Sequence, residues 1–186
     1  MHIGKLLNKD ILSIGLRTPL SIMTTENEQL LIEQLRNAMK SRALVYAAMY
    51  EEMAAEFGAD KAREVCKRAI YKRGEAIAGV FAPHAPADLK ALKDTFLNFI
   101  PQGKHIFEPE VVQCTAQELE IQFHRCPLKE AWQEAGYEGE ALANLCDIGG
   151  IVDYGTFEKA GFSIQSDTWQ PGREGCCRLH IRPGPG

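Results

Sequence analysis

An alternating run that leads directly into a helical pattern is the feature that most constrains the fold of this chain. From Glu118 to His124, apolar and polar side chains alternate as they do in a β-strand. Pro127 suits the first position of a helix, and apolar residues then recur at helical spacing until Gly136. We therefore expect Cys126 at a strand-to-helix junction, where the helix dipole and unpaired backbone N–H groups favour a thiolate.

The rest of the chain divides into a helical half and a half that contains strands. In the first half, periodic apolar residues predict helices at about 26–57, 60–80 and 86–100, the first with a capping box at Thr25 and Glu28. In the second half, strands are expected at 110–115, 119–124, 162–169 and 176–181, and a further helix at about 140–159. The pattern predicts an α+β fold, with a helical N-terminal half packed on a small, mostly antiparallel sheet with crossing helices.

Length and composition limit the domain organisation and the partners. A chain of 186 residues suits one domain, expected over 25–182, with an N-terminal arm at 1–24 and a flexible tail at 183–186. The net charge of -4 argues against nucleic acid, because phosphate binding needs a basic face. With no apolar run of membrane-spanning length and no signal peptide, we expect a cytoplasmic protein without a membrane partner. The arm and the methionine-rich first helix favour a homo-oligomer.

Nucleophilic catalysis is the first chemistry that the junction could support. If the strand stays regular, His124 and Cys126 point the same way, and a thiol near an imidazole is the pairing that this chemistry needs. The alternative is that Cys126 is a small buried residue and His124 lies on an exposed strand face. Both interpretations remain open at this stage.

A second candidate lies in residues 145–154. On a helix, one face would carry a thiol, two glycines and a carboxylate, namely Cys146, Gly149, Gly150 and Asp153. The glycines would then form a substrate floor between the thiol and the carboxylate. The alternative is a helix break at the glycines, with Asp147 or Asp153 capping the following turn.

The vicinal cysteines Cys176 and Cys177 form the third candidate. Strand alternation places one on the apolar side and one on the polar side, and the alternative is one core cysteine with one incidental neighbour. Arg178 or Arg182 could hold a substrate carboxylate. We expect no cofactor, but zinc or an iron–sulfur cluster on Cys126, Cys146 and Cys177 stays open, because spacing alone does not separate these sites from a catalytic thiol.

These residues, in this order, resemble the L-2-amino-thiazoline-4-carboxylic acid hydrolase family over about residues 30–182. In the helical half the resemblance rests on Arg42, Glu51, Gly58, Ala62 and Gly74. In the second half it rests on Cys126-Pro127-Leu128, Leu145-Cys146 with an acid close behind, Asp153-Tyr154, Gly161-Phe162, Gly172 and Cys176-Cys177. Family members usually carry an aromatic residue and an Arg after the last cysteine, where this chain has Leu179 and His180.

The resemblance implies hydrolytic opening of a small cyclic amidine such as 2-aminothiazoline-4-carboxylate. Cys126 would attack the ring carbon, and Cys146 would be a second catalytic thiol. Asp153 or Asp147 would hold the amidinium, and His124 or His180 would move protons. The residues expected to bind substrate are Asp147, Gly149, Gly150, Cys176, Cys177, Arg178 and His180.

Three alternatives stay open beside this interpretation. The first is an activated water as the nucleophile, with the cysteines only lining the site. The second is a hydrolase for another small C–N bond. The third is a non-enzymatic small-ligand, metal or cluster-binding domain of 4-vinyl reductase type.

Overall fold

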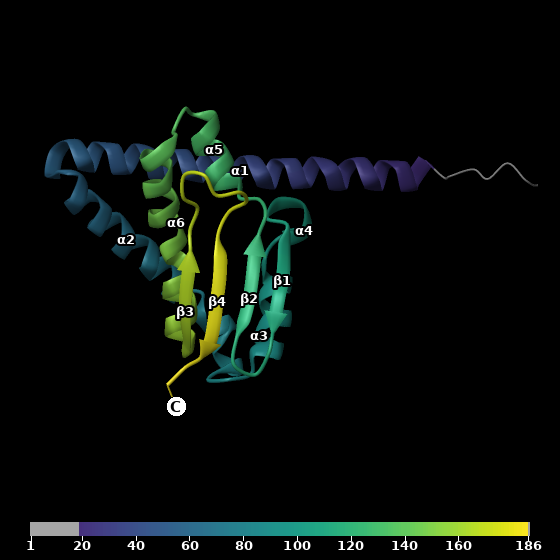
Figure 1. Cartoon of the computed structure of the whole chain (residues 1–186). Helices are drawn as coiled ribbons and strands as arrows, with labels where there is room; N and C mark the ends of the chain where they lie inside the picture. The colour runs from purple at the N-terminus through teal and green to yellow at the C-terminus, as the bar shows by residue number, and fades with distance from the viewer. Residues whose placement is uncertain (1–18, 186) are drawn as a thin grey trace, which may run out of the picture.

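The computed structural model describes residues 19–185, and it combines a long N-terminal helix with a helix-covered sheet (Figure 1). The helices are α1 (Pro19–Phe57), α2 (Ala59–Glu75), α3 (Leu89–Phe99), α4 (Gly103–Ile106), α5 (Pro127–Glu134) and α6 (Gly139–Ala160). Two 3₁₀ turns follow α2, namely η1 (Ala78–Val80) and η2 (Ala82–His84). The strands are β1 (Pro109–Cys114), β2 (Leu119–Phe123), β3 (Phe162–Asp167) and β4 (Arg178–Pro183).

The four strands form one sheet in the order β1-β2-β4-β3, and every neighbouring pair is antiparallel. The predicted α+β fold is confirmed. In the central pair, Leu119 lies opposite Ile181 and Ile121 lies opposite Leu179, so these apolar side chains share one face. That register sends the alternate polar residues to the opposite face.

The apolar face of the sheet packs against α3 and the C-terminal part of α6 (Figure 1). Aromatic rings from three segments meet there: Phe96 lies edge-on to Phe157 at 5.2 Å, and Phe81 contacts both. Such edge-to-face pairs add to the area that they bury. The opposite face is open and charged, and we call it the open face; it carries Glu118, Glu120, Asp167, Arg178, His180 and Arg182.

Two glycines allow α2 and α6 to cross in direct backbone contact. A Cβ atom on Gly74 would lie 2.2 Å from the Val152 carbonyl oxygen, and one on Gly155 would lie 2.1 Å from the Tyr71 carbonyl oxygen. No larger residue fits at either position without moving a helix. This crossing fixes the height of α6 along the sheet, and α6 carries part of the candidate site.

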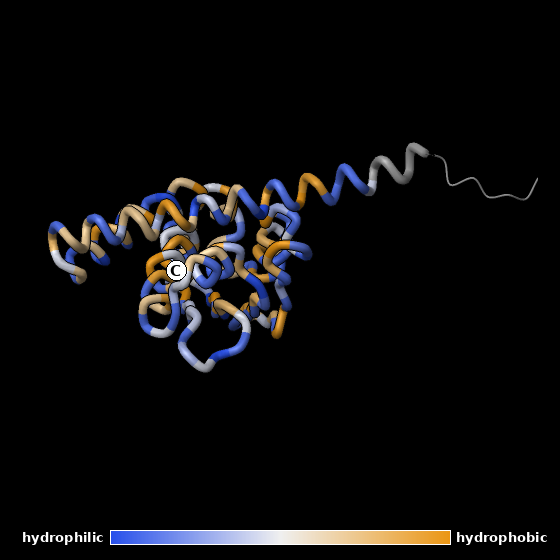
Figure 2. The backbone as a smooth tube through the Cα atoms, turned by 90° about the horizontal axis from the view of Figure 1, so that it is seen from above, coloured by the Kyte–Doolittle hydropathy of each residue, from blue (hydrophilic) through white to orange (hydrophobic). Residues whose placement is uncertain are grey.

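Helix α1 runs across the molecule and extends past it on its N-terminal side (Figures 1 and 2). Its central part packs on α5, where the Trp132 indole N–H donates to the Ala43 carbonyl at 2.8 Å. Several large apolar side chains of α1 stay exposed, namely Leu30, Leu31, Leu44, Val45 and Met49. The predicted homo-oligomer stays a prediction. No helix within residues 19–185 has the length and apolar character needed to cross a bilayer.

The helix boundaries differ from the sequence prediction at several places. Helix α1 begins at Pro19 rather than near residue 26, so Thr25 lies inside the helix and the predicted capping box is wrong. The arm predicted at 1–24 falls largely on residues 1–18, which lie outside the described residues. Helix α3 begins at Leu89 because the Asp88 carboxylate accepts a hydrogen bond from the Ala91 N–H.

The predicted C-terminal tail is also partly structured. Pro183 closes β4, and the Gly184 N–H donates to the Pro86 carbonyl at 2.9 Å. A Cβ atom on Gly184 would lie 1.9 Å from the Gly161 carbonyl oxygen, so the chain passes closely over the end of α6. The sequence predicts a strand at 176–181, but β4 starts at Arg178 and runs to Pro183. Both vicinal cysteines lie in the loop that precedes it.

Candidate active site at a cluster of four thiols

Four cysteines from three parts of the chain meet beside α5 and α6. We call Cys126, Cys146, Cys176 and Cys177 the thiol cluster, because the charge on Cys126 acts on each of the other three thiols. Strand β2 ends at Phe123, and Cys126 is the N-cap of α5 with an extended backbone, which confirms the predicted strand-to-helix junction. The backbone N–H groups of Leu128 and Lys129, in the first turn of α5, lower the pKa of the Cys126 thiol, although Cys126 makes no side-chain capping hydrogen bond to that helix.

Backbone pairing places Cys176 beside Cys126. The Phe123 N–H donates to the Cys177 carbonyl at 2.9 Å, and the Cys176 N–H donates back to the Phe123 carbonyl at 3.0 Å. These bonds extend the β2–β4 pairing to Phe123, the last residue of β2, and to the loop that precedes β4. As a result, the Cys126 and Cys176 thiols hydrogen-bond to each other.

The two bonded thiols differ in their tendency to ionise. The hydrogen bond from Cys176 and the two N–H groups of α5 lower the pKa of Cys126, although burial opposes them. The same thiol–thiol bond and burial raise the pKa of Cys176. The negative charge of the pair therefore belongs on Cys126, with Cys176 as the proton donor.

The remaining two thiols stay protonated. Burial raises the pKa of Cys146 to about 12, and burial likewise raises the pKa of Cys177. Negative charge on Cys126 acts in the same direction on both. Within the thiol cluster, Cys126 is thus the one thiol whose pKa is lowered.

Asp153 supplies a carboxyl group on the same helix as Cys146. Burial raises its pKa to about 7, and its charge also acts on Cys177. Within residues 19–185 it makes no hydrogen bond or ion pair. The buried hydroxyl oxygen of Ser166, on β3, also has no hydrogen-bond partner in the described part of the chain. The backbone N–H of Ser166 donates to the Tyr154 hydroxyl at 3.0 Å.

Lys129 is the cation of this region, and the sequence prediction missed it. Its Nζ donates to the Gly175 carbonyl at 2.5 Å and lies 5.3 Å from the centre of the Trp169 ring. Its charge lowers the pKa values of Cys146 and Cys176, although larger causes outweigh it. Its position in the first turn of α5, directly after the candidate thiolate, was the available signal.

The two glycines of α6 do not break the helix, so that alternative is wrong. Protein side chains fill the space that they free. A Cβ atom on Gly149 would lie 3.2 Å from Trp132 Cη2, and one on Gly150 would lie 2.7 Å from Thr168 Cγ2. The floor of the site is therefore packed with an indole and a methyl group.

Two predicted site residues pair with other partners. The strand ends before His124, and the His124 side chain is exposed and lies 2.8 Å from the Glu110 carboxylate, so the regular strand that would align it with Cys126 is absent. Asp147 forms an ion pair with Lys67 of α2 at 2.6 Å. Of the two acids predicted behind Cys146, Asp153 is the one left without a partner.

Arg178 and His180 lie on the open face of the sheet. Arg178 pairs with Glu120 at 2.7 Å, and the His180 ring nitrogens lie 3.3 Å from Glu118 and 3.7 Å from Asp167. Glu118, Glu120 and His180 place their donor atoms within 4.8 Å of one another, as metal ligands would. Among residues 19–185 no such convergent group contains a cysteine.

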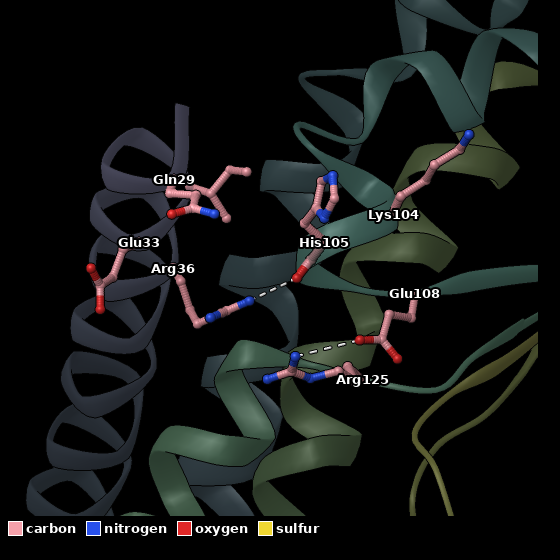
Figure 3. A pocket seen from close by; sticks show the side chains of 8 residues that line it. Gln29, Glu33, Arg36, Lys104, His105, Glu108 and Arg125 are labelled. Carbon is pink, nitrogen blue, oxygen red and sulfur yellow. Dashed lines mark hydrogen bonds and ion pairs between the residues drawn. The ribbon is translucent and has the colours of Figure 1, made fainter. Parts of the chain in front are cut away.

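A separate groove of about 400 Å³ lies between α1 and the α4–β1 corner (Figure 3). The Arg36 guanidinium reaches from α1 to donate to the His105 carbonyl of α4 at 2.7 Å, and Arg125 lies 3.4 Å from Glu108 (Figure 3). No member of the thiol cluster lines this groove. The thiols instead lie near Lys129 and Trp169, and Cys146 and Cys176 are buried.

Comparison with known proteins assigns the family. A family model described as L-2-amino-thiazoline-4-carboxylic acid hydrolase matches residues 36–181, a span that includes the whole thiol cluster, Lys129 and Asp153. The curated proteins contain no match to this chain. The resemblance drawn from the sequence is confirmed. Because the match covers most of its length, the chain belongs to the L-2-amino-thiazoline-4-carboxylic acid hydrolase family, whose members act on the C–N bond of a cyclic amidine.

Proposed function

We propose that this protein hydrolyses 2-aminothiazoline-4-carboxylate through a covalent adduct on Cys126. The family supplies the reaction class and a small-molecule substrate. The observation that carries the cysteine mechanism is the position of Cys126 as the N-cap of α5, beside Cys176, where this thiol and the backbone N–H groups of Leu128 and Lys129 lower its pKa. A thiolate held in this way is a nucleophile at neutral pH.

The charges beside the thiol cluster match those of the substrate. The ring carries an amidinium, and Asp153 offers a carboxylate without a protein partner. At the other end the substrate carries a carboxylate, and Lys129 offers an ammonium whose present acceptor is a backbone carbonyl. We assign amidinium binding to Asp153 and carboxylate binding to Lys129.

The reaction begins when the Cys126 sulfur adds to the ring carbon between nitrogen and sulfur. The ring C–N bond then breaks: the Asp153 carboxylate takes a proton from the exocyclic nitrogen of the adduct and passes it to the leaving ring nitrogen, so the carbon stays bound to Cys126 and to the substrate sulfur as C=NH. The pKa of Asp153, about 7, suits proton transfer in both directions. Water then adds to the sulfur-bound carbon and returns a proton to Asp153. The bond between this carbon and Cys126 breaks, which releases carbamoyl-cysteine and restores the thiolate.

Substrate entry requires movement of the segment that joins β3 to β4. Its residues 168–177 have no regular structure, and Gly172 and Gly175 hold positive φ angles of 83° and 72°. Lys129 holds this segment through the Gly175 carbonyl, so a substrate carboxylate that takes the ammonium also releases the segment. In this proposal substrate binding and opening of the site are coupled.

The test is turnover of L-2-aminothiazoline-4-carboxylate by the purified protein, with carbamoyl-cysteine identified by mass spectrometry. We expect Cys126→Ser to lower kcat by at least about 10³-fold. The matched control is Cys114→Ser, which changes an exposed thiol on β1 and should keep wild-type turnover. After an acid quench, the wild-type peptide that contains Cys126 should carry the mass of the opened ring.

Two outcomes would contradict parts of the proposal. Full turnover by Cys126→Ser, with no adduct on the wild type, would assign the attack to an activated water and leave the cysteines as lining. No product from wild-type protein with a normal unfolding transition would exclude this substrate. Unfolding midpoints of both variants show whether a loss of turnover reflects chemistry or folding.

A further inference from the structure

We propose that Cys126 and Cys176 form an oxidation site, at which a hydroperoxide joins the two thiols in a reversible disulfide. The cysteines are reduced in the structure, and the two thiols hydrogen-bond directly to each other. The proposal concerns the chemistry of this pair. Its consequence for activity rests on the proposed function, since a disulfide would remove the nucleophile.

The backbone holds the two cysteines side by side from both directions. Cys176 is fixed by its N–H bond to the Phe123 carbonyl, and Phe123 in turn bonds to the Cys177 carbonyl. Cys126 is fixed as the N-cap of α5, only three residues after Phe123. Both anchors share Phe123, and Cys126 packs against the apolar cluster that contains Cys176, so the two side chains stay close.

The pair is asymmetric in the way that a peroxide-reactive thiol and its resolving thiol require. Cys126 is partly exposed and has a lowered pKa, whereas Cys176 is 3 % exposed and has a raised pKa. A peroxide therefore meets Cys126 first. The charge of Cys126 acts on Cys146 and Cys177, but no hydrogen bond joins either of them to Cys126 among residues 19–185.

The chemistry balances with a hydroperoxide as the oxidant. The Cys126 thiolate attacks the O–O bond and becomes a sulfenic acid, and the other oxygen leaves as water or an alcohol after it takes a proton. The Cys176 sulfur then attacks the sulfenic sulfur, and the departing hydroxide takes the Cys176 proton and leaves as water. The two thiols lose two electrons, the peroxide gains two, and an external thiol can reverse the disulfide.

The experiment maps this bond without any use of turnover. The reduced protein is treated with hydrogen peroxide, the remaining thiols are alkylated, and peptides are identified by mass spectrometry without reduction. We expect a linked pair of peptides that contain Cys126 and Cys176, which dithiothreitol separates. A link from Cys126 to Cys146 or Cys177, or Cys126 oxidised to the sulfinic acid in the wild type without a link, would overturn the proposal.

Two variants sharpen the result. Cys176→Ser should abolish the link and leave Cys126 as sulfenic or sulfinic acid, while the matched control Cys177→Ser should keep the link. Because Cys176 is buried, Cys176→Ala is the second variant if the serine does not fold. A link that persists at Cys126 in both variants of position 176 would contradict the assignment of Cys176.

The oxidation and the hydrolysis can fail separately. A Cys126–Cys176 link in a protein that turns over no 2-aminothiazoline-4-carboxylate supports the oxidation site and contradicts the proposed function. Turnover that needs Cys126, in a protein that forms no link, supports the proposed function and contradicts the oxidation site. If both hold, peroxide should abolish turnover, and dithiothreitol should restore it in the wild type but not after sulfinic acid formation in Cys176→Ser.

Discussion

Ionisable side chains gather both at the thiol cluster and on the open face of the sheet, but in the part of the chain that the structure describes only those on the open face form ion pairs with one another. On the open face, Glu118 pairs with Arg182 at 2.6 Å and Glu120 pairs with Arg178 at 2.7 Å. Beside the thiol cluster, Asp153 pairs with no residue among 19–185. The comparison indicates that a charged group with a protein partner supports the fold, whereas a partly buried group without one is available to a ligand.

The two regions also differ in what ionisation does to stability. An ion pair on a sheet surface stabilises the folded state slightly. Ionisation of Asp153 opposes folding, because burial favours its neutral form and raises its pKa to about 7. The buried Asp153 carboxyl therefore lowers the stability of the folded state at neutral pH, which is typical of a residue in a functional site.

The largest expected effect separates the two regions by activity. Asp153→Asn removes the carboxylate that is proposed to bind the amidinium and to move protons, so kcat/KM should fall by about 10²- to 10³-fold. Glu120→Gln is the matched change on the open face and should leave kcat/KM within about twofold of wild type. Steady-state kinetics on both variants checks this. A similar fall in kcat/KM in the two variants would contradict the assignment of the site to the thiol cluster rather than to the open face.

The pH dependence of unfolding tests the same carboxyl group. Its folded pKa of about 7 lies above the ordinary value of 3.8, so the folded state binds its proton more tightly than the unfolded state does. Its contribution to stability is complete below about pH 4 and is lost as the pH rises to about 7, with an upper limit of roughly 4 kcal/mol. Denaturant unfolding of wild type and Asp153→Asn should therefore diverge over this range, with the variant more stable at pH 8. Parallel curves would show that Asp153 ionises normally.

Lys129 and Arg178 offer a comparison between two candidate anchors for the substrate carboxylate. Lys129→Met removes the ammonium beside the thiol cluster and should raise KM by about 10- to 100-fold, the value of a charge-assisted hydrogen bond. Arg178→Met, on the open face, should leave KM unchanged because Glu120 already holds its guanidinium. The opposite result would show that Arg178 binds the substrate carboxylate, as the sequence predicted.

The smallest expected effect is the energy of one pair on the open face. Arg178 is substantially exposed, so its interaction with Glu120 should contribute less than about 1 kcal/mol. A double-mutant cycle with Glu120→Gln and Arg178→Met, read by denaturant unfolding, measures this coupling. A coupling of several kcal/mol would show that the open face supports the fold far more strongly than a surface pair does.

Local patterns predicted those parts of the molecule that depend on neighbours in sequence. The α+β fold and the junction at Cys126 follow from the change of period between residues 118 and 136. The start of α1 was missed because Thr25 and Glu28 match a capping box that the longer helix overrides. The short helix α4 was missed because four residues carry no periodic signal.

The candidate site was predicted only in part, because several of its contacts join distant segments. The expected partners His124, Asp147, Arg178 and His180 each pair with residues outside the thiol cluster. Conversely, Lys129 entered the site through its contacts with Gly175 and Trp169, which lie some 40 residues further along the chain. Spacing in sequence contains no information about such contacts.

The sequence by itself determined the type of fold, the helix start that favours a thiolate at Cys126, and the residues that identify the family. These depend on local backbone preferences and on residue order. Only the tertiary structure decided that Cys176 is the thiol bonded to Cys126 and that Asp153 is the acid without a partner. The physical reason is that burial and pairing, which set the charge of both groups, arise from sheet register and helix crossing.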